Sequence, residues 1–269
     1  MFNKIIILLS LLIISSCSNN VNKKKNIDSS SLLSINYMQT SAEVRALYYQ
    51  AFNIAKFKLD NYLKLKVKDD NLDKENKKDA IIVDVDETIV VTIPYNAINM
   101  MKSRNYPNGW KEWIDKLEAK PVAGAIEFLQ YAKSKNITIF YVTNRKENVK
   151  ESTYKNLKNL GYPILKENLL TKNNSSNKSL RRKKVLEYYE VILYIGDNLI
   201  DFPGNFDKEF TKTINGRKKQ VEKYKKNFGD KWIILPNSVY GDWENVIYNY
   251  NWDKTVEERI KEKEKVLEY

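Results

Sequence analysis

The chain has 269 residues, of which 42% are hydrophobic and 30% charged. It contains no histidine and one cysteine, which excludes histidine-dependent triads, histidine-bound zinc and an intramolecular disulfide framework. Lysine and arginine number 46 against 34 acidic residues, a net charge of +12, but the lysines are scattered without a nucleic-acid-binding motif. We therefore expect no specific nucleic-acid partner, and any catalysis must rely on carboxylates, hydroxyls and cationic side chains.

The N-terminal segment has the features of a bacterial export signal. Lys4 supplies a positive charge, and the apolar run from Ile5 to Ile14 is too short for a mature membrane span. The run Ile-Ser-Ser-Cys at 14–17 resembles a lipoprotein signal, in which Cys17 becomes the lipidated first residue; the alternative is an ordinary signal and a buried thiol. We expect a signal peptide over 1–16 and a polar tether over 17–35. The protein would then be lipid-anchored in the bacterial cell envelope, at the outer membrane.

Residues 36–66 form the first predicted helix of the mature chain. Apolar residues recur through this segment at helical spacing, and Thr40 with Glu43 has the pattern of a capping box. A lysine-rich link over 68–79 leads to the run Ala-Ile-Ile-Val-Asp-Val at 80–85. Its continuous apolar character predicts a buried parallel strand.

Strands and helices alternate through the rest of the chain. Further strands are predicted at 137–142, 191–195 and 232–235, core helices at 122–135, 147–160 and 178–189, and charged surface helices at 220–226 and 253–268. This order predicts an α/β fold with a doubly wound, mainly parallel sheet. Ligands bind such sheets at the carboxyl ends of the strands, so the residues that follow each strand are the candidates for a site.

Two strand ends carry groups suited to an anionic substrate. Asp84 and Asp86 follow the first strand at positions i and i+2, so that one carboxylate could attack while the other transfers protons. Thr143, Asn144 and Arg145 follow the strand predicted at 137–142, where a hydroxyl and backbone N–H groups could hold an anion.

A second acidic pair, Asp197 and Asp201, follows the strand predicted at 191–195, and Lys178 lies at the start of the preceding helix. Four aspartates in one cleft would repel one another without a cation. Oxygen ligands without histidine or cysteine favour Mg²⁺, which shares its coordination with water and phosphate oxygens. The pattern therefore predicts a magnesium-assisted site for a phosphate ester.

At this level of detail the sequence resembles a known family. Residues 82–95 (Ile-Val-Asp-Val-Asp-Glu-Thr-Ile-Val-Val-Thr-Ile-Pro-Tyr) and 195–202 (Ile-Gly-Asp-Asn-Leu-Ile-Asp-Phe) are similar to the paired signatures of class C acid phosphatases, bacterial surface lipoproteins of the haloacid dehalogenase superfamily. The resemblance covers nearly the whole mature chain. It implies a phosphatase domain over 36–269, with an α/β core from about residue 80 and a small helical cap that includes 36–66 and about 89–120.

The resemblance also implies roles for individual residues. Asp84 would be the nucleophile that forms an aspartyl-phosphate, and Asp86 the acid and then the base. The implied Mg²⁺ ligands are Asp84, the backbone carbonyl of Asp86, and Asp197, with Asp201 supporting them or holding a metal-bound water. The implied phosphate-binding residues are Thr143, Asn144 and Lys178. Lys172 competes with Lys178 for the lysine role.

Aromatic residues bear on the substrate. Trp110, Trp113 and Tyr240 fit either the hydrophobic core or, as the resemblance implies, a platform that stacks on a nucleobase. The implied substrates are small phosphate monoesters, including nucleoside 5′-monophosphates and nicotinamide mononucleotide. We expect an acidic pH optimum, because Asp86 must be protonated for the first step while Asp84 stays ionised. The alternative is a non-catalytic surface-binding lipoprotein, an adhesin or ligand binder that retains the fold. The sequence leaves the oligomeric state open, with a homodimer as one alternative.

Overall fold

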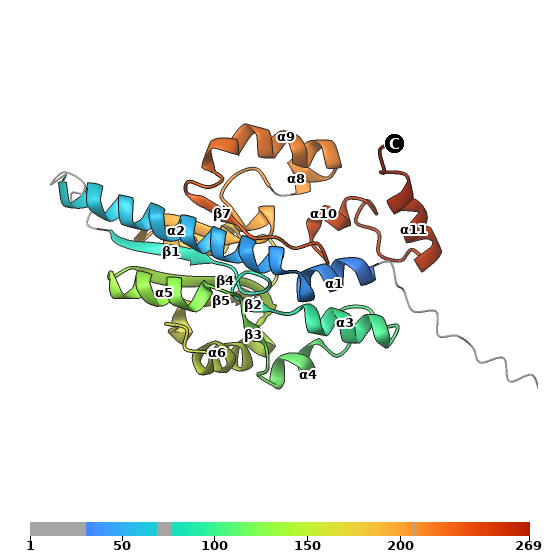
Figure 1. Ribbon diagram of the computed structural model, residues 1–269, viewed down its shortest axis with the longest axis horizontal. Helices are drawn as coiled ribbons and strands as arrows, with labels where there is room; N and C mark the ends of the chain where they lie inside the picture. Colours follow the sequence, from blue (N-terminus) through green and yellow to red (C-terminus); the bar gives the residue numbers. More distant parts are fainter. Residues whose placement is uncertain (1–30, 69–76, 207) are drawn as a thin grey trace, which may run out of the picture.

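A central sheet of five parallel strands organises the computed structural model, which describes residues 31–68, 77–206 and 208–269 (Figure 1). The strand order is β5-β4-β1-β6-β7. From one edge to the other the strands are β5 (Leu169–Lys172), β4 (Thr138–Lys146), β1 (Lys78–Val83), β6 (Tyr189–Gly196) and β7 (Trp232–Ile234). The chain starts at the centre, builds one side and returns to build the other, which confirms the predicted doubly wound α/β fold.

Each face of the sheet has its own layer. Ile81 and Val83 lie in one hydrophobic cluster with residues of α2 (Ala42–Lys68), α5 (Ala125–Ser134) and α6 (Lys150–Asn159). Ala80 and Ile82 alternate with them and lie in a second cluster, which includes α7 (Ser179–Leu186) and several aromatic rings, Phe202, Phe206 and Trp232 among them. From Ala80 to Val83 both faces of β1 are buried, and this part of the strand is continuously apolar.

The N-terminal helical segment is split into α1 (Leu32–Thr40) and α2 at Ser41. The Ser41 Oγ accepts hydrogen bonds from the backbone N–H groups of Glu43 and Val44, at 3.1 and 3.2 Å. The capping box predicted for Thr40 and Glu43 is therefore wrong by one residue, because the Thr40 hydroxyl instead donates to the Asn36 carbonyl.

Most of the segment 36–66, which the sequence assigned to a cap, lies in the helical layer on the sheet. Ala51, Ala55 and Leu59 of α2 are buried in the core cluster, and α2 packs beside α5 and against β6 and β7 (Figure 1). This helix therefore forms part of the core layer.

The segment of about 89–120 is an excursion between β1 and α5. The strands β2 (Val90–Val91) and β3 (Lys120–Pro121) pair as an antiparallel ribbon. Between them lie α3 (Ile93–Met101), which contacts α1, and α4 (Trp110–Asp115), which contacts α6 (Figure 1). The ribbon thus closes a small helical unit next to the loop that follows β1.

Four further helices complete the described chain: α8 (Lys208–Thr211), α9 (Ile214–Tyr224), α10 (Asp242–Asn245) and α11 (Val256–Glu264). Among the residues that the structure describes, none of the helices combines the length and hydrophobicity of a membrane span. The predicted signal peptide, Cys17 and most of the predicted tether lie outside the described residues.

Candidate active site

The loop after β1 is held against the centre of the sheet. The Asp84 N–H donates to the Ile195 carbonyl of β6 at 2.9 Å, which continues the β1–β6 pairing by one residue. Two N–H groups, those of Ile89 and Val90, then donate to the Val85 carbonyl at 3.0 Å each. The loop is therefore tight, and the buried Asp84 carboxylate has a fixed place at the carboxyl end of β1.

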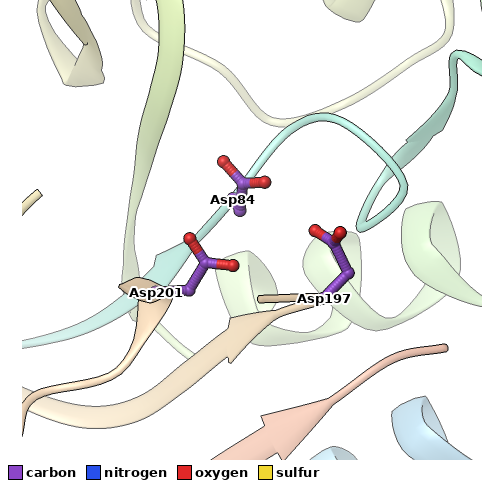
Figure 2. Close-up of side chains that lie close together, drawn as sticks. All are labelled: Asp84, Asp197 and Asp201. Carbon is purple, nitrogen blue, oxygen red and sulfur yellow. The ribbon is translucent and has the colours of Figure 1, made fainter. Parts of the chain in front are cut away.

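Three carboxylates converge at this place (Figure 2). One oxygen from each of Asp84, Asp197 and Asp201 lies within 4.8 Å of the others. Gly196, at the end of β6, makes the approach possible, because a Cβ there would lie 2.4 Å from the Asp201 side chain. The Asp201 Oδ2 also accepts a hydrogen bond from the Asn198 N–H at 2.9 Å, which closes a capping box on the turn over Leu199–Asp201.

Asp197 is oriented by donors from two other segments. The Thr88 hydroxyl donates to its Oδ1 at 3.0 Å, and the Asn237 side-chain amide donates to its Oδ2 at 2.9 Å. Burial, together with the negative charge of Asp201, raises the pKa of Asp197 to about 7. Thr88 and Asn237 were not among the residues selected from the sequence, because their role depends on the position of Asp197 in space.

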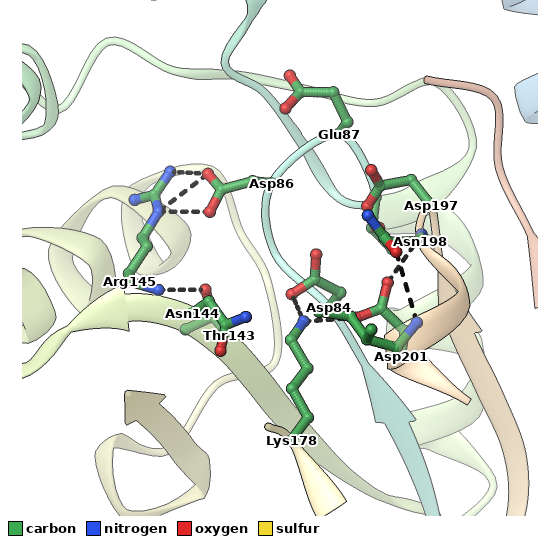
Figure 3. A network of polar contacts seen from close by, with 12 residues as sticks. Asp84, Asp86, Glu87, Thr143, Asn144, Arg145, Lys178, Asp197, Asn198 and Asp201 are labelled. Atoms are coloured by element: carbon green, nitrogen blue, oxygen red, sulfur yellow. Dashed lines mark hydrogen bonds and ion pairs between the residues drawn. The ribbon is translucent and has the colours of Figure 1, made fainter. Parts of the chain in front are cut away.

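Lys178 lies between two of the carboxylates (Figure 3). Its ammonium group contacts Asp84, and its Nζ lies 2.6 Å from the Asp201 Oδ1. Burial would lower the pKa of Lys178, but attraction to Asp201 and Asp84 outweighs it and raises the pKa. Lys172, the competing candidate, lies instead at the end of β5 and lines an open pocket with Lys146 and Glu147.

The donor set fits a hard divalent metal ion. Burial raises the pKa of Asp84 well above its usual range, and the charges of Asp201 and Asp197 add to this effect while Lys178 opposes it. Three converging carboxylates and one ammonium leave uncompensated negative charge in a buried place, and oxygen donors suit such an ion. The Asp86 side chain is not part of this triad.

The anion-binding residues predicted to follow a strand at 137–142 lie within the last part of β4, where its register with β5 shifts between Val142 and Lys146. Thr143 is fully buried, and its Oγ1 accepts a hydrogen bond from the Arg145 N–H at 3.1 Å. Arg181 of α7 donates to the Thr143 carbonyl at 2.5 Å and to the Asn144 Oδ1 at 2.6 Å. Thr143, Asn144 and Lys178 thus lie around Asp84, as Figure 3 shows, with Arg181 as an additional brace that sequence reasoning did not select.

Asp86 points away from the triad toward Arg145 (Figure 3). The guanidinium donates to its Oδ1 from Nη2 at 2.8 Å and from Nε at 3.0 Å. Sequence reasoning named Arg145 as part of a strand end but gave it no role, because its partner is 59 positions away in the chain.

Glu87 is a second residue that sequence reasoning missed. Its φ of 53° places it in the left-handed region, and it is fully buried. The carboxylate accepts from the backbone N–H groups of Thr92 and Ile93 at the start of α3, from the Thr92 hydroxyl, and from the Tyr240 hydroxyl. Burial and the neighbouring Asp86 raise its pKa to about 8. Glu87 therefore ties the loop after β1 to α3 and to the segment after β7.

The three aromatic candidates lie on two sides of the loop. Trp110 and Trp113 stack with ring centroids 5.7 Å apart, and Trp110 lies 5.6 Å from the Arg145 guanidinium, on the Asp86 side. Tyr240 lies on the Glu87 side, and its N–H donates to the Asn237 Oδ1 at 3.3 Å. All three side chains are partly exposed, so each could still contact a substrate.

Comparisons with known proteins show what the whole chain is similar to. Residues 13–243 match the model of the HAD superfamily, subfamily IIIB (acid phosphatase). A solved structure of the class C acid phosphatase from Bacillus anthracis is similar to the chain, with a TM-score of 0.82 and 36% identity over 90% of this chain and 98% of that one. A structure of the same phosphatase with tungstate bound is similar to the same degree.

Proposed function

Because the chain belongs to the acid phosphatases of HAD subfamily IIIB, and is thus a phosphomonoesterase, we propose that Asp84 is its nucleophile and that catalysis proceeds through an aspartyl-phosphate. The observation that carries this proposal is the convergence of Asp84, Asp197, Asp201 and Lys178 at the carboxyl end of the sheet. The alternative of a non-catalytic surface-binding lipoprotein is set aside, because both similar structures and the family are phosphatases.

The proposed reaction has two displacements. An Asp84 oxygen attacks phosphorus, the bond to the leaving oxygen breaks, and Asp86 gives that oxygen a proton. Water then attacks phosphorus, its proton passes to Asp86, and the bond between phosphorus and Asp84 breaks. Thr143, Asn144 and Lys178 hold the phosphoryl oxygens and stabilise their charge during both transfers.

We propose Mg²⁺ as the cofactor, held by Asp84, Asp197 and the Asp86 backbone carbonyl, with Asp201 supporting them. The support is the buried set of oxygen donors around Asp84. When bound, Mg²⁺ would neutralise negative charge on the phosphoryl group.

The decisive experiment measures 4-nitrophenyl phosphate hydrolysis by the wild type and Asp84→Asn, with Mg²⁺ and with EDTA. We expect activity only in the wild type with Mg²⁺, and phosphate covalently trapped on the wild type but not on Asp84→Asn. Equal rates in both proteins would overturn the nucleophile assignment. Equal rates of the wild type in Mg²⁺ and EDTA would overturn only the proposed metal requirement.

We expect the phosphatase activity to be highest below pH 7. Activity that rises steadily from pH 5 to pH 9 would contradict this expectation.

Nucleoside 5′-monophosphates, including nicotinamide mononucleotide, are the proposed substrates among small phosphate monoesters. The support is the partly exposed aromatic surface of Trp110, Trp113 and Tyr240 around the loop that carries Asp84 and Asp86. A panel comparing 5′-AMP and nicotinamide mononucleotide with glucose 6-phosphate and glycerol phosphate tests this proposal. A Trp110→Ala variant that loses kcat/KM equally for all four substrates would argue against stacking.

We also propose that the protein is lipid-anchored through Cys17 in the bacterial cell envelope, at the outer membrane. The support lies in the sequence, where a short apolar run leads to the single cysteine and a polar segment. Expression with labelled palmitate, followed by detergent phase separation, should show label and detergent partitioning for the wild type. Cys17→Ser should lose both, and a labelled Cys17→Ser protein would contradict the anchor.

Sedimentation of the protein without residues 1–17 would decide between a monomer and a homodimer.

A further inference from the structure

Arg145 is a buried cation whose position is fixed on three sides. Its side chain is 1% exposed, and its Nη1 donates to the Thr153 hydroxyl of α6 at 3.0 Å. The Trp110 ring of α4 lies over the guanidinium at 5.6 Å. The backbone N–H next to this side chain is bound by Thr143. Few rotamers are therefore open to the guanidinium, and its Nε and Nη2 donate to Asp86.

The contact with Asp86 is asymmetric. The Asp86 Oδ1 accepts from Nη2 at 2.8 Å and from Nε at 3.0 Å, whereas Oδ2 has one longer contact, from Nε at 3.3 Å (Figure 3). A short charge-assisted pair to one oxygen fixes the plane of the carboxyl group. It leaves Oδ2, the less engaged oxygen, to carry and transfer a proton.

The pair also differs from an ordinary surface ion pair. The Asp86 side chain is 19% exposed, whereas the Arg145 side chain is enclosed. Burial of a guanidinium is costly unless it is fully paired, so a fold that buries Arg145 beside Asp86 keeps the two groups together. The structure thus places a rigid donor behind the partly exposed side chain of Asp86 at the end of the sheet.

We infer that Arg145 is a positioning residue for Asp86: it binds Oδ1 and thereby aims Oδ2 at the leaving oxygen. This inference rests on the acid–base role given to Asp86 in the proposed function. In the first displacement the proton on Oδ2 passes to the leaving oxygen as its bond to phosphorus breaks. In the second, a water proton returns to Oδ2 as the water oxygen bonds to phosphorus and the bond from phosphorus to Asp84 breaks. Arg145 acts through Asp86 and need not touch the substrate.

The test uses leaving groups that differ in their need for a proton. Positioned proton transfer contributes about 10²- to 10⁴-fold when the leaving group is a poor one. For Arg145→Lys and Arg145→Gln we expect kcat/KM for glycerol phosphate to fall about 30-fold or more, and kcat/KM for 2,4-dinitrophenyl phosphate to fall less than about 3-fold. Asp86→Asn should show the same selectivity more strongly. In the Asp86→Asn background, replacement of Arg145 should cost nothing further.

Arg182→Lys is the matched control for a purely structural effect. Arg182 is also buried and donates to the Ile200 carbonyl, but it does not contact Asp86. Any loss it causes should be the same for both leaving groups. Uniform losses in the Arg145 variants, or additive losses in the Asp86→Asn background, would overturn the positioning role.

Thr153→Val provides a second route if the Arg145 variants do not fold. It removes the hydroxyl that holds Nη1 and keeps both charges and the buried volume, so we expect the same selectivity at about 3- to 10-fold. Equal rates for Thr153→Val and wild type would then count against the inference.

If Asp86→Asn itself loses activity uniformly, the acid–base assignment fails and the Arg145 inference fails with it. If Asp86→Asn is selective and the Arg145 variants are not, only the Arg145 inference fails.

Discussion

At the scale of single residues, Lys178 is the candidate phosphate-binding lysine that is buried among carboxylates. It is 3% exposed and lies between Asp84 and Asp201. Lys178→Met leaves these two carboxylates without their ammonium partner, so we expect kcat/KM to fall about 100-fold or more. Lys172→Met is the matched control, because that lysine lines a separate open pocket, and its kcat/KM should stay within about 3-fold of wild type. A larger loss in Lys172→Met than in Lys178→Met would reverse the assignment.

The buried carboxyl group of Glu87 should make the free energy of unfolding depend on pH. Burial, with Asp86, raises its pKa in the folded protein to about 8, well above the value of an unfolded glutamate. Its stabilising contribution is therefore complete below the unfolded pKa and is lost as the pH rises toward 8. In Glu87→Gln, an amide that is never ionised can still accept from the Thr92 and Ile93 N–H groups and donate to the Tyr240 hydroxyl.

We therefore expect the free energy of unfolding of Glu87→Gln to exceed that of the wild type by an amount that grows from pH 5 to pH 8, up to a few kcal/mol, on the order set by 1.4 kcal/mol per pKa unit. Urea unfolding in EDTA at several pH values measures the difference. Glu87→Ala, which leaves the same donors unpaired, should be less stable than both at every pH. Parallel pH profiles for wild type and Glu87→Gln would show that Glu87 is ionised throughout.

The residues that sequence reasoning found and those it missed differ in a physical way. Asp84, Asp197 and Lys178 could be found because each follows a strand end or starts a helix, and the topology of a parallel sheet brings those positions together. Arg145 and Glu87 could not be assigned, because their partners depend on side-chain directions and on a left-handed backbone angle at a non-glycine residue. Neither property leaves a periodic pattern in the sequence.

At the scale of elements, Ser41 separates α1 from α2. Its hydroxyl caps the first turn of α2 through Glu43 and Val44, and a serine cap contributes about 1 kcal/mol. Ser41→Ala should lower the free energy of unfolding by that amount. Thr40→Ala, one residue earlier and exposed, should stay within about 0.5 kcal/mol of wild type. Thermal or urea unfolding compares the two; a larger effect in Thr40→Ala would restore the capping box that the sequence suggested.

The strands that sequence patterns found are those that contain a continuous apolar run. The predicted strands at 80–85, 137–142, 191–195 and 232–235 all appear in the central sheet, within a few residues of their predicted ends. β5 was not predicted, because its four residues Leu169–Lys172 include a threonine and a lysine and so contain no continuous apolar run. β2 and β3 are two residues each, and only their pairing with one another defines them.

At the scale of the whole molecule, the acidic triad should couple metal binding to folding. Three carboxylates gathered in the folded state repel one another, and the unfolded chain separates them. We expect Mg²⁺ to raise the melting temperature, by the equivalent of about 2.7 kcal/mol at a concentration 100-fold above its Kd. Asp197→Asn should lose this shift. Asp230→Asn, which removes an exposed carboxylate paired with Lys58, should keep it; identical shifts in both variants would place the ion elsewhere.

The strand order has a consequence for how the protein could be divided. β1 lies between a β4–β5 side, which brings Thr143, and a β6–β7 side, which brings Asp197, while the exposed segment 173–177 joins β5 to α7 just before Lys178. A chain cut within 173–177 would carry Asp84, the proposed nucleophile, in one fragment, and Lys178 with two of the three triad carboxylates in the other. Neither fragment alone should have phosphatase activity. Phosphate release from a mixture of the two would therefore measure their reassembly into a single sheet.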